Sequence, residues 1–297
     1  MKTLNIGDIS VNKILDGEEH FPAINAFPEI KTEIFEEHKS WMHSFYDFNS
    51  QMLILSMHSY LIQTPSLNIL IDTCIGNDKN RVGQGPIYKA NEGILSHWNN
   101  RSSNYLENLQ AHELTLEDID IVMCTHMHAD HVGWNTRLVD DRWVPTFPNA
   151  KYLMVEKEYE FWRDLEEDPF GDVFGESVAP IFEAGIADFV EPNHIVGNGV
   201  SFESTPGHTP GHVSVLIESE GSRALITGDC IHHPVQMTRT DWCSSADFDQ
   251  DQGQATRESL LKHYVDSDVL VIGTHFATPT AGYIKSLEEG SYWLDVS

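Results

Sequence analysis

The residues of this chain that could do chemistry concentrate in one short segment, THMHADHVGW, at positions 125–134. Within six positions it offers His126, His128, Asp130 and His131. Imidazole nitrogen and carboxylate oxygen are the ligand types that suit Zn²⁺ and neighbouring divalent ions. The alternation would let one ion take the first two histidines while a second ion takes the Asp-His pair. A polar loop with incidental histidines is the alternative, and it is the weaker interpretation for so dense a cluster after an apolar run.

Three later segments each add one residue of a type that binds metal ions. The segments TPGHTPGH, TGDC and GTHF present, in that order, His208, Asp229 and His275. Pro-Gly steps form tight turns that fix the direction of the first histidine, and the glycine of TGDC lets the backbone come close to a neighbour. Either histidine alone would more often be an ordinary buried or surface residue. Together with the first segment, the set favours a metal site.

Each of these segments follows an apolar run that is typical of a buried strand. The expected strands are Ser66–Asp72, Asp120–Thr125, Lys151–Val155, Val200–Thr205, Val213–Ile217, Arg223–Thr227 and Asp268–Ile272. The expected helices are Ile87–Asn99, Glu156–Glu166, Gly175–Ala187 and Gln254–Val265. This alternation predicts an α/β architecture with a buried sheet. Because such proteins gather their sites at the carboxyl ends of strands, we expect the four segments to converge.

The chain shows no convincing linker, so residues 1–297 are expected to form one domain. Residues 1–50 differ from the rest, because several acids lie beside aromatic residues such as Trp41 and Phe45. We interpret them as an N-terminal extension, either a cap or dimer-contact segment or a peripheral hairpin and helix packed on the core. The first alternative makes a homodimer worth testing. Residues 75–90 are interpreted as a surface loop, with a lid over the site as the alternative.

The charge balance excludes whole classes of partner. Lys and Arg number 18 and Asp and Glu number 46, which gives a formal net charge of −28 beside 16 histidines. Nucleic acids and anionic membrane surfaces need a basic face, so neither is an expected partner. No apolar run reaches the length of a signal-peptide core or a membrane span. The four cysteines lack C-x-x-C pairing, so we expect a cytoplasmic protein with reduced thiols.

The motif H-x-H-x-D-H, followed by the later His, Asp and His, resembles that of the metallo-β-lactamase-fold hydrolases over roughly residues 53–282. That family has an αβ/βα sandwich with a two-metal site on its edge, and we expect the same fold here. The resemblance implies a first ion on His126, His128 and His208, a second on Asp130, His131 and His275, and a bridge between them through Asp229. Zn²⁺ is the first expectation for the two divalent ions, with Mn, Fe or Co as alternatives. Asp72, in an Asp-Thr-Cys turn where the family has Asp-Thr-Gly, is expected to support a ligand histidine.

The implied reaction is hydrolysis by a hydroxide that the two ions share. Asp130 or Asp229 would orient this nucleophile or carry its proton. The TPGHTPGH segment and Trp134 are similar to those of the quorum-quenching lactonases and the methyl parathion hydrolase group. Lactonases commonly carry Tyr three residues after the bridging Asp, and this chain carries His232 there. We expect His232 to act as a hydrogen-bond donor or general acid, with a surface or supporting histidine as the alternative.

The sequence therefore predicts a two-metal hydrolase that opens a small neutral lactone or cleaves a related carboxylic ester. The alternatives are a phosphotriesterase or arylesterase on the same site, and a metal-binding sensor without turnover. A strongly acidic surface around a locally cationic site favours uncharged substrates over polyanions.

Overall fold

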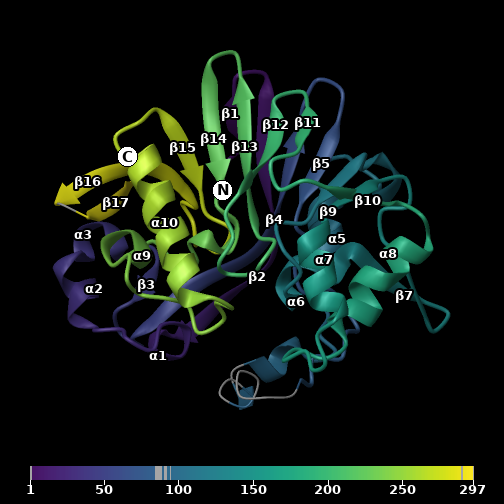
Figure 1. Cartoon of the computed structure of the whole chain (residues 1–297), viewed down its shortest axis with the longest axis horizontal. Helices are drawn as coiled ribbons and strands as arrows, with labels where there is room; N and C mark the ends of the chain where they lie inside the picture. Colours follow the sequence, from purple (N-terminus) through teal and green to yellow (C-terminus); the bar gives the residue numbers. More distant parts are fainter. Residues whose placement is uncertain (1, 84–88, 90–91, 94, 289, 297) are drawn as a thin grey trace.

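Two β-sheets lie face to face and carry helices on their outer sides (Figure 1). The computed structural model describes residues 2–83, 89, 92–93, 95–288 and 290–296. The first sheet runs in the order β1 (Leu4–Ile6), β2 (Ile9–Pro22), β4 (Met52–Gln63), β5 (Asn68–Ile71), β6 (Ile121–Met123), β9 (Lys151–Val155) and β10 (Ala187–Val190), and β3 (Tyr46–Asp47) pairs with β4. The second sheet runs in the order β11 (Ile195–Gly197), β12 (Val200–Ser204), β13 (Val213–Ser219), β14 (Ser222–Ile226), β15 (Val269–Ile272), β16 (Ala281–Glu288) and β17 (Ser291–Asp295).

The inner faces of the two sheets form one apolar layer. Val11 and Ile62 of the first sheet and Val215 and Ile226 of the second are completely buried in it. Fully burying such a side chain stabilises the fold by about 1.5–3 kcal/mol. The central strands β5, β6 and β9 run parallel, as do β14 and β15. Their sequences are mostly aliphatic because one face of each strand packs on the other sheet and the opposite face packs under helices.

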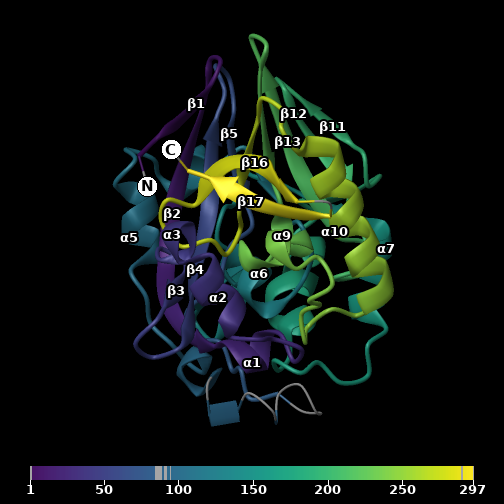
Figure 2. The ribbon, with the colours of Figure 1, turned by 90° about the vertical axis from the view of Figure 1, so that its left-hand side faces the viewer.

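Helices cover both outer faces. The first sheet is covered by α5 (Tyr105–Gln110), α7 (Glu156–Arg163), a π-helical turn at Phe174–Val178 and α8 (Ala179–Glu183). The second is covered by α9 (Val235–Thr238) and α10 (Gln250–Tyr264). At the start of α10, the Asp249 side chain accepts a hydrogen bond from the Gln252 backbone at 2.9 Å, which caps the helix. Figure 2 shows β1, β2 and β4 on one side, β12 and β13 on the other, and α5 and α10 at opposite edges. The expected αβ/βα sandwich is confirmed.

The N-terminal segment contributes directly to the sandwich. Strand β2 pairs with β4 along most of its length, so residues 4–22 are part of the first sheet rather than a layer over it. Three short helices follow, α1 (Ala23–Ala26), α2 (Glu33–Glu37) and α3 (Lys39–Met42). They bury Phe27, Phe35 and Phe45 in the same apolar cluster as α9 and α10. The ring of Phe35 stacks on Tyr46 with the centroids 3.8 Å apart.

Several elements differ from the sequence predictions. Each expected strand is present within two residues of its predicted ends, but β1, β2, β3, β4, β10, β11, β16 and β17 were not predicted, nor was the hairpin of β7 (Thr136–Val139) and β8 (Arg142–Pro145). Strand β2 contains Asp, Gly and Glu and shifts register at Gly17, which hides its alternation. The expected helix Ile87–Asn99 falls partly on residues outside the described ranges, and its described end is a 3₁₀ turn, η1 (Ser96–Trp98). The expected helix Gly175–Ala187 divides into the π-helical turn and α8.

The described part of segment 75–90 is anchored in the protein. Lys79 and Arg81 are buried. The Lys79 Nζ donates to Thr136 Oγ1 at 2.6 Å and lies 3.7 Å from the centroid of the Trp143 ring. Trp143 lies on β8 (Arg142–Pro145), which pairs with β7 (Thr136–Val139). The prediction of an exposed loop is therefore wrong for these two residues, because their cationic groups find partners inside; residues 84–88 and 90 lie outside the described ranges.

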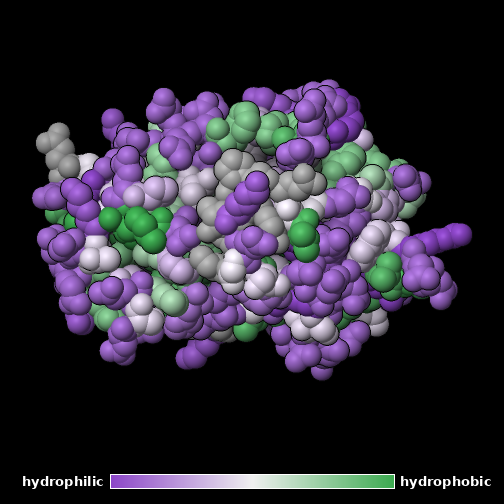
Figure 3. Space-filling view, turned by 90° about the horizontal axis from the view of Figure 1, so that it is seen from below, coloured by the Kyte–Doolittle hydropathy of each residue, from purple (hydrophilic) through white to green (hydrophobic). Residues whose placement is uncertain are grey.

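The surface agrees with the high acidic content. Seen from below, hydrophilic side chains cover most of the molecule, with separate apolar patches between them (Figure 3). Among the described residues, no helix combines the length and apolar character needed to cross a bilayer.

Candidate metal centre

The four predicted ligand segments converge because each follows a central strand. The first follows β6, and its second half forms the single helical turn α6 (Ala129–Val132). The others follow β12, β14 and β15, and the TGDC segment forms a 3₁₀ turn, η5 (Gly228–Cys230). Gly228 adopts a φ of 53°, and a Cβ there would lie 2.5 Å from His212 Nε2. Glycine is therefore required for this close approach.

Three ring nitrogens form the first ligand group. The His126 Nε2 lies 2.9 Å from His128 Nδ1 and 3.2 Å from His208 Nε2. The His128 Nδ1 lies 2.8 Å from His208 Nε2. A tetrahedral ion with metal–nitrogen bonds of about 2.0–2.1 Å holds its ligand nitrogens about 3.3 Å apart. The three nitrogens lie 2.8–3.2 Å apart, somewhat closer than this, so a small outward shift of the rings would give the spacing that a zinc-sized ion requires.

The second ligand group adds carboxylate oxygen to imidazole nitrogen. The His131 Nε2 and His275 Nε2 are 3.3 Å apart, and Asp130 Oδ2 lies 3.7 and 3.6 Å from them. This mixed donor set also suits a divalent ion. The side chains come from two different sheets, since His275 follows β15 while the other two lie on α6.

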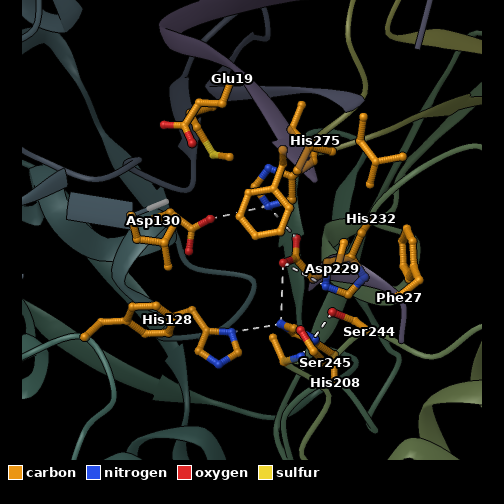
Figure 4. Close-up of a pocket in the computed structure, with 18 of the residues that line it drawn as sticks. Glu19, Phe27, His128, Asp130, His208, Asp229, His232, Ser244, Ser245 and His275 are labelled. Carbon is orange, nitrogen blue, oxygen red and sulfur yellow. Dashed lines mark hydrogen bonds and ion pairs between the residues drawn. The ribbon is translucent and has the colours of Figure 1, made fainter. Parts of the chain in front are cut away.

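Asp229 lies between the two groups. Its Oδ2 is 3.4 Å from His208 Nε2 and 3.3 Å from His131 Nε2, and its Oδ1 is 3.2 Å from His275 Nε2. Oδ1 is buried and has no hydrogen-bond partner among the described residues. Unpaired buried oxygen is costly, so its position is well explained by a site for a bridging metal ligand (Figure 4).

Polar partners on the outer side orient the histidines. The His131 Nδ1–H donates to Asp72 Oδ2 at 2.9 Å, and the His208 Nδ1–H donates to Asp247 Oδ1 at 2.8 Å. Asp72 also accepts two hydrogen bonds from Thr125 at 2.7 and 2.8 Å. A carboxylate in this place fixes the ring and turns its other nitrogen to the metal. Asp72 was expected to act in this way, whereas Asp247 was not recognised in the sequence.

A second carboxylate that the sequence did not reveal is Glu158, on α7. Its Oε1 accepts from the Met127 N–H at 3.1 Å, and its Oε2 accepts from the Gly211 N–H at 2.9 Å. Oε1 also accepts from Trp162 Nε1 at 2.6 Å. The side chain is buried, and burial raises its pKa. The Met127 and Gly211 N–H groups lie in the loops that carry His126, His128 and His208, so one carboxylate fixes the spacing of the first ligand group.

The two groups differ in their affinity for protons. Burial lowers the pKa of His128 to about 4, and it lowers the pKa of His126 and His208 well below the usual value. Burial alone would also lower the pKa of His131, but Asp229, Asp130 and Asp72 outweigh it and raise that pKa well above the usual value. The first group therefore offers neutral lone pairs at pH 7, while the second group holds a proton in the metal-free protein.

His232 enters the site beside Asp229. Its Nε2 lies 3.4 Å from Asp229 Oδ2, and its ring lies parallel to that of His275. Neither ring nitrogen has a hydrogen-bond partner among the described residues. Burial lowers its pKa to about 3. The next residue, His233, points elsewhere and bonds to the Phe45 carbonyl at 2.8 Å.

An apolar pocket opens over the two groups and encloses about 770 Å³, solvent at its mouth included. Its walls come from β2, β4, the α1 region, the segment around η1 and residues 244–246; Figure 4 shows Glu19, Phe27, Ser244 and Ser245 around the proposed ligands. The apolar lining residues include Phe21, Phe27, Leu55, Met57 and Phe170. Trp134, just after the ligand loop, is not part of this lining and packs in the core, with its ring stacked on Tyr105 at 5.5 Å.

The fold and these side chains define the class of protein. Residues 55–276 match the model of the Metallo-beta-lactamase superfamily, and the chain belongs to this superfamily. An N-acyl homoserine lactonase of Bacillus sp is 29% identical over 178 residues, which are 59% of this chain and 64% of that protein. Metallo-beta-lactamase domain-containing protein 1 of Xenopus laevis is 28% identical over 57% of this chain and 59% of that protein. The chain thus spans less than two thirds of the length of these curated relatives.

Solved structures show the same fold over nearly the whole chain. AidC, a dizinc quorum-quenching lactonase in complex with a product, superposes with a TM-score of 0.78 at 21% identity, covering 100% of this chain and 97% of that one. The hydrolase AbOPH of the β-lactamase superfamily gives 0.78 at 23% identity, covering 99% and 97%. At these identities the likeness establishes the architecture.

Proposed function

We propose that this protein is a two-metal hydrolase that opens lactones or cleaves related carboxylic esters. The observation that carries the proposal is the pair of ligand groups that share Asp229 at the base of an apolar pocket. The similarity to proteins named N-acyl homoserine lactonase supports the lactone as the substrate class. A small neutral substrate also agrees with the net charge of −28.

The metal ligands would divide as the spacing of the donor atoms suggests. His126, His128 and His208 would hold one ion, Asp130, His131 and His275 would hold the other, and Asp229 would contact both. Zn²⁺ is the proposed ion, with Mn, Fe or Co as alternatives. Two bound ions would supply a nucleophile from water near neutral pH and polarise the substrate carbonyl.

The side chains at the pocket would handle protons and orientation. Asp130 is the more exposed carboxylate of the site, at 15%, and faces the pocket, so it can accept the proton of the attacking water. His232 is neutral at pH 7, because burial lowers its pKa to about 3. It therefore keeps one N–H to donate to the oxygen that leaves when the ring opens. The apolar walls exclude bulk water and strengthen both interactions.

Hydrolysis by the metal-loaded protein tests the proposal. We would load the purified chain with Zn²⁺, Mn²⁺, Fe²⁺ or Co²⁺, measure metal content, and assay lactones, aryl esters and aryl phosphotriesters. We expect about two ions per chain and the highest kcat/KM on a lactone or carboxylic ester. Preference for phosphotriesters would select the alternative enzyme. Full metal loading without hydrolysis of any of these substrate classes would favour the metal-binding sensor. Undiminished activity in the presence of a chelator would contradict the metal site.

A further inference from the structure

A buried ion pair lies beside the short helix α6, which carries two of the proposed ligands of the second ion. Arg81 Nη1 donates to Glu176 Oε1, and the two side chains are 1% and 7% exposed. Neither residue is among those described as lining the pocket. A buried ion pair is often no more stabilising than apolar residues of the same volume. The role of this pair therefore depends on what else the guanidinium contacts.

The Arg81 guanidinium connects two loops at the metal centre. Its Nη2 donates to the Ile75 carbonyl at 3.0 Å and to the Ala129 carbonyl at 3.5 Å. Ile75 lies in the loop that follows β5, residues 72–76. Ala129 is the first residue of α6 and lies between the proposed ligands His128 and Asp130. One guanidinium therefore joins the loop after β5 to the helical turn that carries the carboxylate ligand.

Backbone hydrogen bonds join the same two loops near the end of α6. The Thr73 N–H donates to the His131 carbonyl at 2.7 Å, and the Gly133 N–H donates to the Cys74 carbonyl at 2.7 Å. With four residues, α6 is too short to be stable through its own hydrogen bonds. Its orientation depends on these outside contacts, and Arg81 supplies the one at its first residue.

Glu176 holds the Arg81 cation in place and neutralises it. The backbone of Glu176 is itself fixed, because its carbonyl accepts from Thr136 Oγ1 at 2.5 Å. Burial lowers the pKa of Arg81, and the charge of the adjacent Glu176 opposes this effect, as does that of Asp130. Without its carboxylate partner, the guanidinium would place an uncompensated positive charge beside α6, which opposes the binding of a divalent cation.

We propose that Arg81, held by Glu176, is a positioning residue for the second ion: by fixing α6 on the loop after β5, it determines where the Asp130 carboxylate and the His131 ring lie. This inference rests on the proposed two-metal function. The described hydrogen bonds of the guanidinium go to Glu176 and to backbone carbonyls, so it acts through the backbone of α6. Its loss should weaken the second ion and spare the first, whose loops Glu158 joins.

Metal binding tests the inference without requiring turnover. Arg81→Lys keeps a charge beside Glu176 but loses the branched donor. Arg81→Met/Glu176→Gln removes both buried charges together, so neither is left unpaired. In titrations of the metal-free chain with Co²⁺, followed by absorption, we expect both variants to bind the second ion about 10–100-fold more weakly and the first ion normally. Arg163→Met, which removes an exposed arginine paired with Asp164, is the control and should bind both ions normally.

Kinetics at saturating metal separate positioning from a general loss of structure. Because Arg81 lies outside the pocket lining, Arg81→Lys should lower kcat about tenfold to 100-fold and leave KM nearly unchanged. Equal weakening of both ions, natural affinity for the second ion in both variants, or a natural protein that binds only one ion would overturn the inference. A second ion weakened as expected, in a protein that hydrolyses none of the substrates, would contradict the proposed reaction alone.

Discussion

The two ligand groups of the candidate metal centre are built differently. His126, His128 and His208 present nitrogen alone, and Glu158 and Asp247 hold their loops and rings from outside; His126 and His208 are buried, whereas His128 is half-buried. The second group mixes nitrogen with the partly exposed Asp130 carboxylate. The first group therefore has the properties of a rigid anchor. Both groups line the pocket, and the second, with its partly exposed carboxylate, has properties suited to proton transfer.

Asp229 is the one predicted ligand that contacts both groups, so its replacement should impair metal binding at both. Asp229→Asn keeps the shape but loses one oxygen and the negative charge that faces five imidazoles. We expect turnover to fall by more than about 100-fold and metal content to fall below two ions per chain. Metal analysis and steady-state kinetics measure both. An Asn variant with two tight ions and natural turnover would contradict the bridging role.

Glu158→Gln should weaken the first group while sparing the second. Glutamine cannot accept from both the Met127 and Gly211 N–H groups, so one buried donor loses its partner and the two loops separate. We expect one of the two ions to bind about 10–100-fold more weakly. Titration of the metal-free protein with Co²⁺, followed by absorption, resolves the two sites. Glu156→Gln, on the exposed side of the same helix, should bind both ions normally; equal weakening of both sites by Glu158→Gln would indicate a general loss of structure.

His232→Ala should affect turnover without affecting either ion. The ring donates no hydrogen bond to the described protein and lies at the pocket, so its loss removes an interaction that only the substrate would complete. We expect kcat to fall about tenfold to 100-fold, with the metal content unchanged. His233→Ala, next in sequence, should destabilise the fold through its lost bond to Phe45. Natural turnover in His232→Ala would return this residue to a supporting role, and loss of an ion would make it a ligand.

The number of protons released on metal binding should differ between the two ligand groups, and this is a small effect. At pH 7 the metal-free protein keeps His131 protonated, since its pKa is raised by Asp229, Asp130 and Asp72 despite burial, whereas His128 with a pKa of about 4 is neutral. Binding at the second site should therefore expel at least one proton, since Asp229 also raises the pKa of His275 despite burial, and binding at the first site should expel none. Calorimetry in buffers of different ionisation enthalpy measures this. Equal release from both sites would contradict the assigned pKa directions.

The same directions predict opposite effects on the metal-free fold. A raised histidine pKa contributes stability that is present below pH about 6.5 and lost as the pH rises through the folded pKa of His131. A lowered pKa has the reverse effect, so burial of neutral His128 costs stability as the pH falls from about 6.5 towards about 4. The unfolding temperature of the metal-free chain, measured as a function of pH, reports both effects.

The local pattern was sufficient to predict much of the fold and the residues that converge. The apolar runs of β5 and β9 are short and unbroken, and β12 and the start of β13 alternate apolar with polar residues; both patterns are typical of strands. Strand β2 was missed because Asp16, Gly17 and Glu18 interrupt its alternation, and its pairing with β4 stabilises it nonetheless. Its place and register in the sheet depend on contacts about 40 residues away along the chain, as the pairing of Glu19 with Leu55 shows.

The sequence by itself determined the donor set, because four of the seven predicted ligand residues lie within six positions and the other three follow recognisable strands. Only the tertiary structure decided which groups hold and surround them. Glu158 reaches Gly211 across 53 positions, Asp247 reaches His208 across 39, and Glu19 reaches Trp98 across 79. No local spacing encodes such contacts. They arise when helices and strands pack, and a buried carboxylate must then find donors wherever the fold brings them.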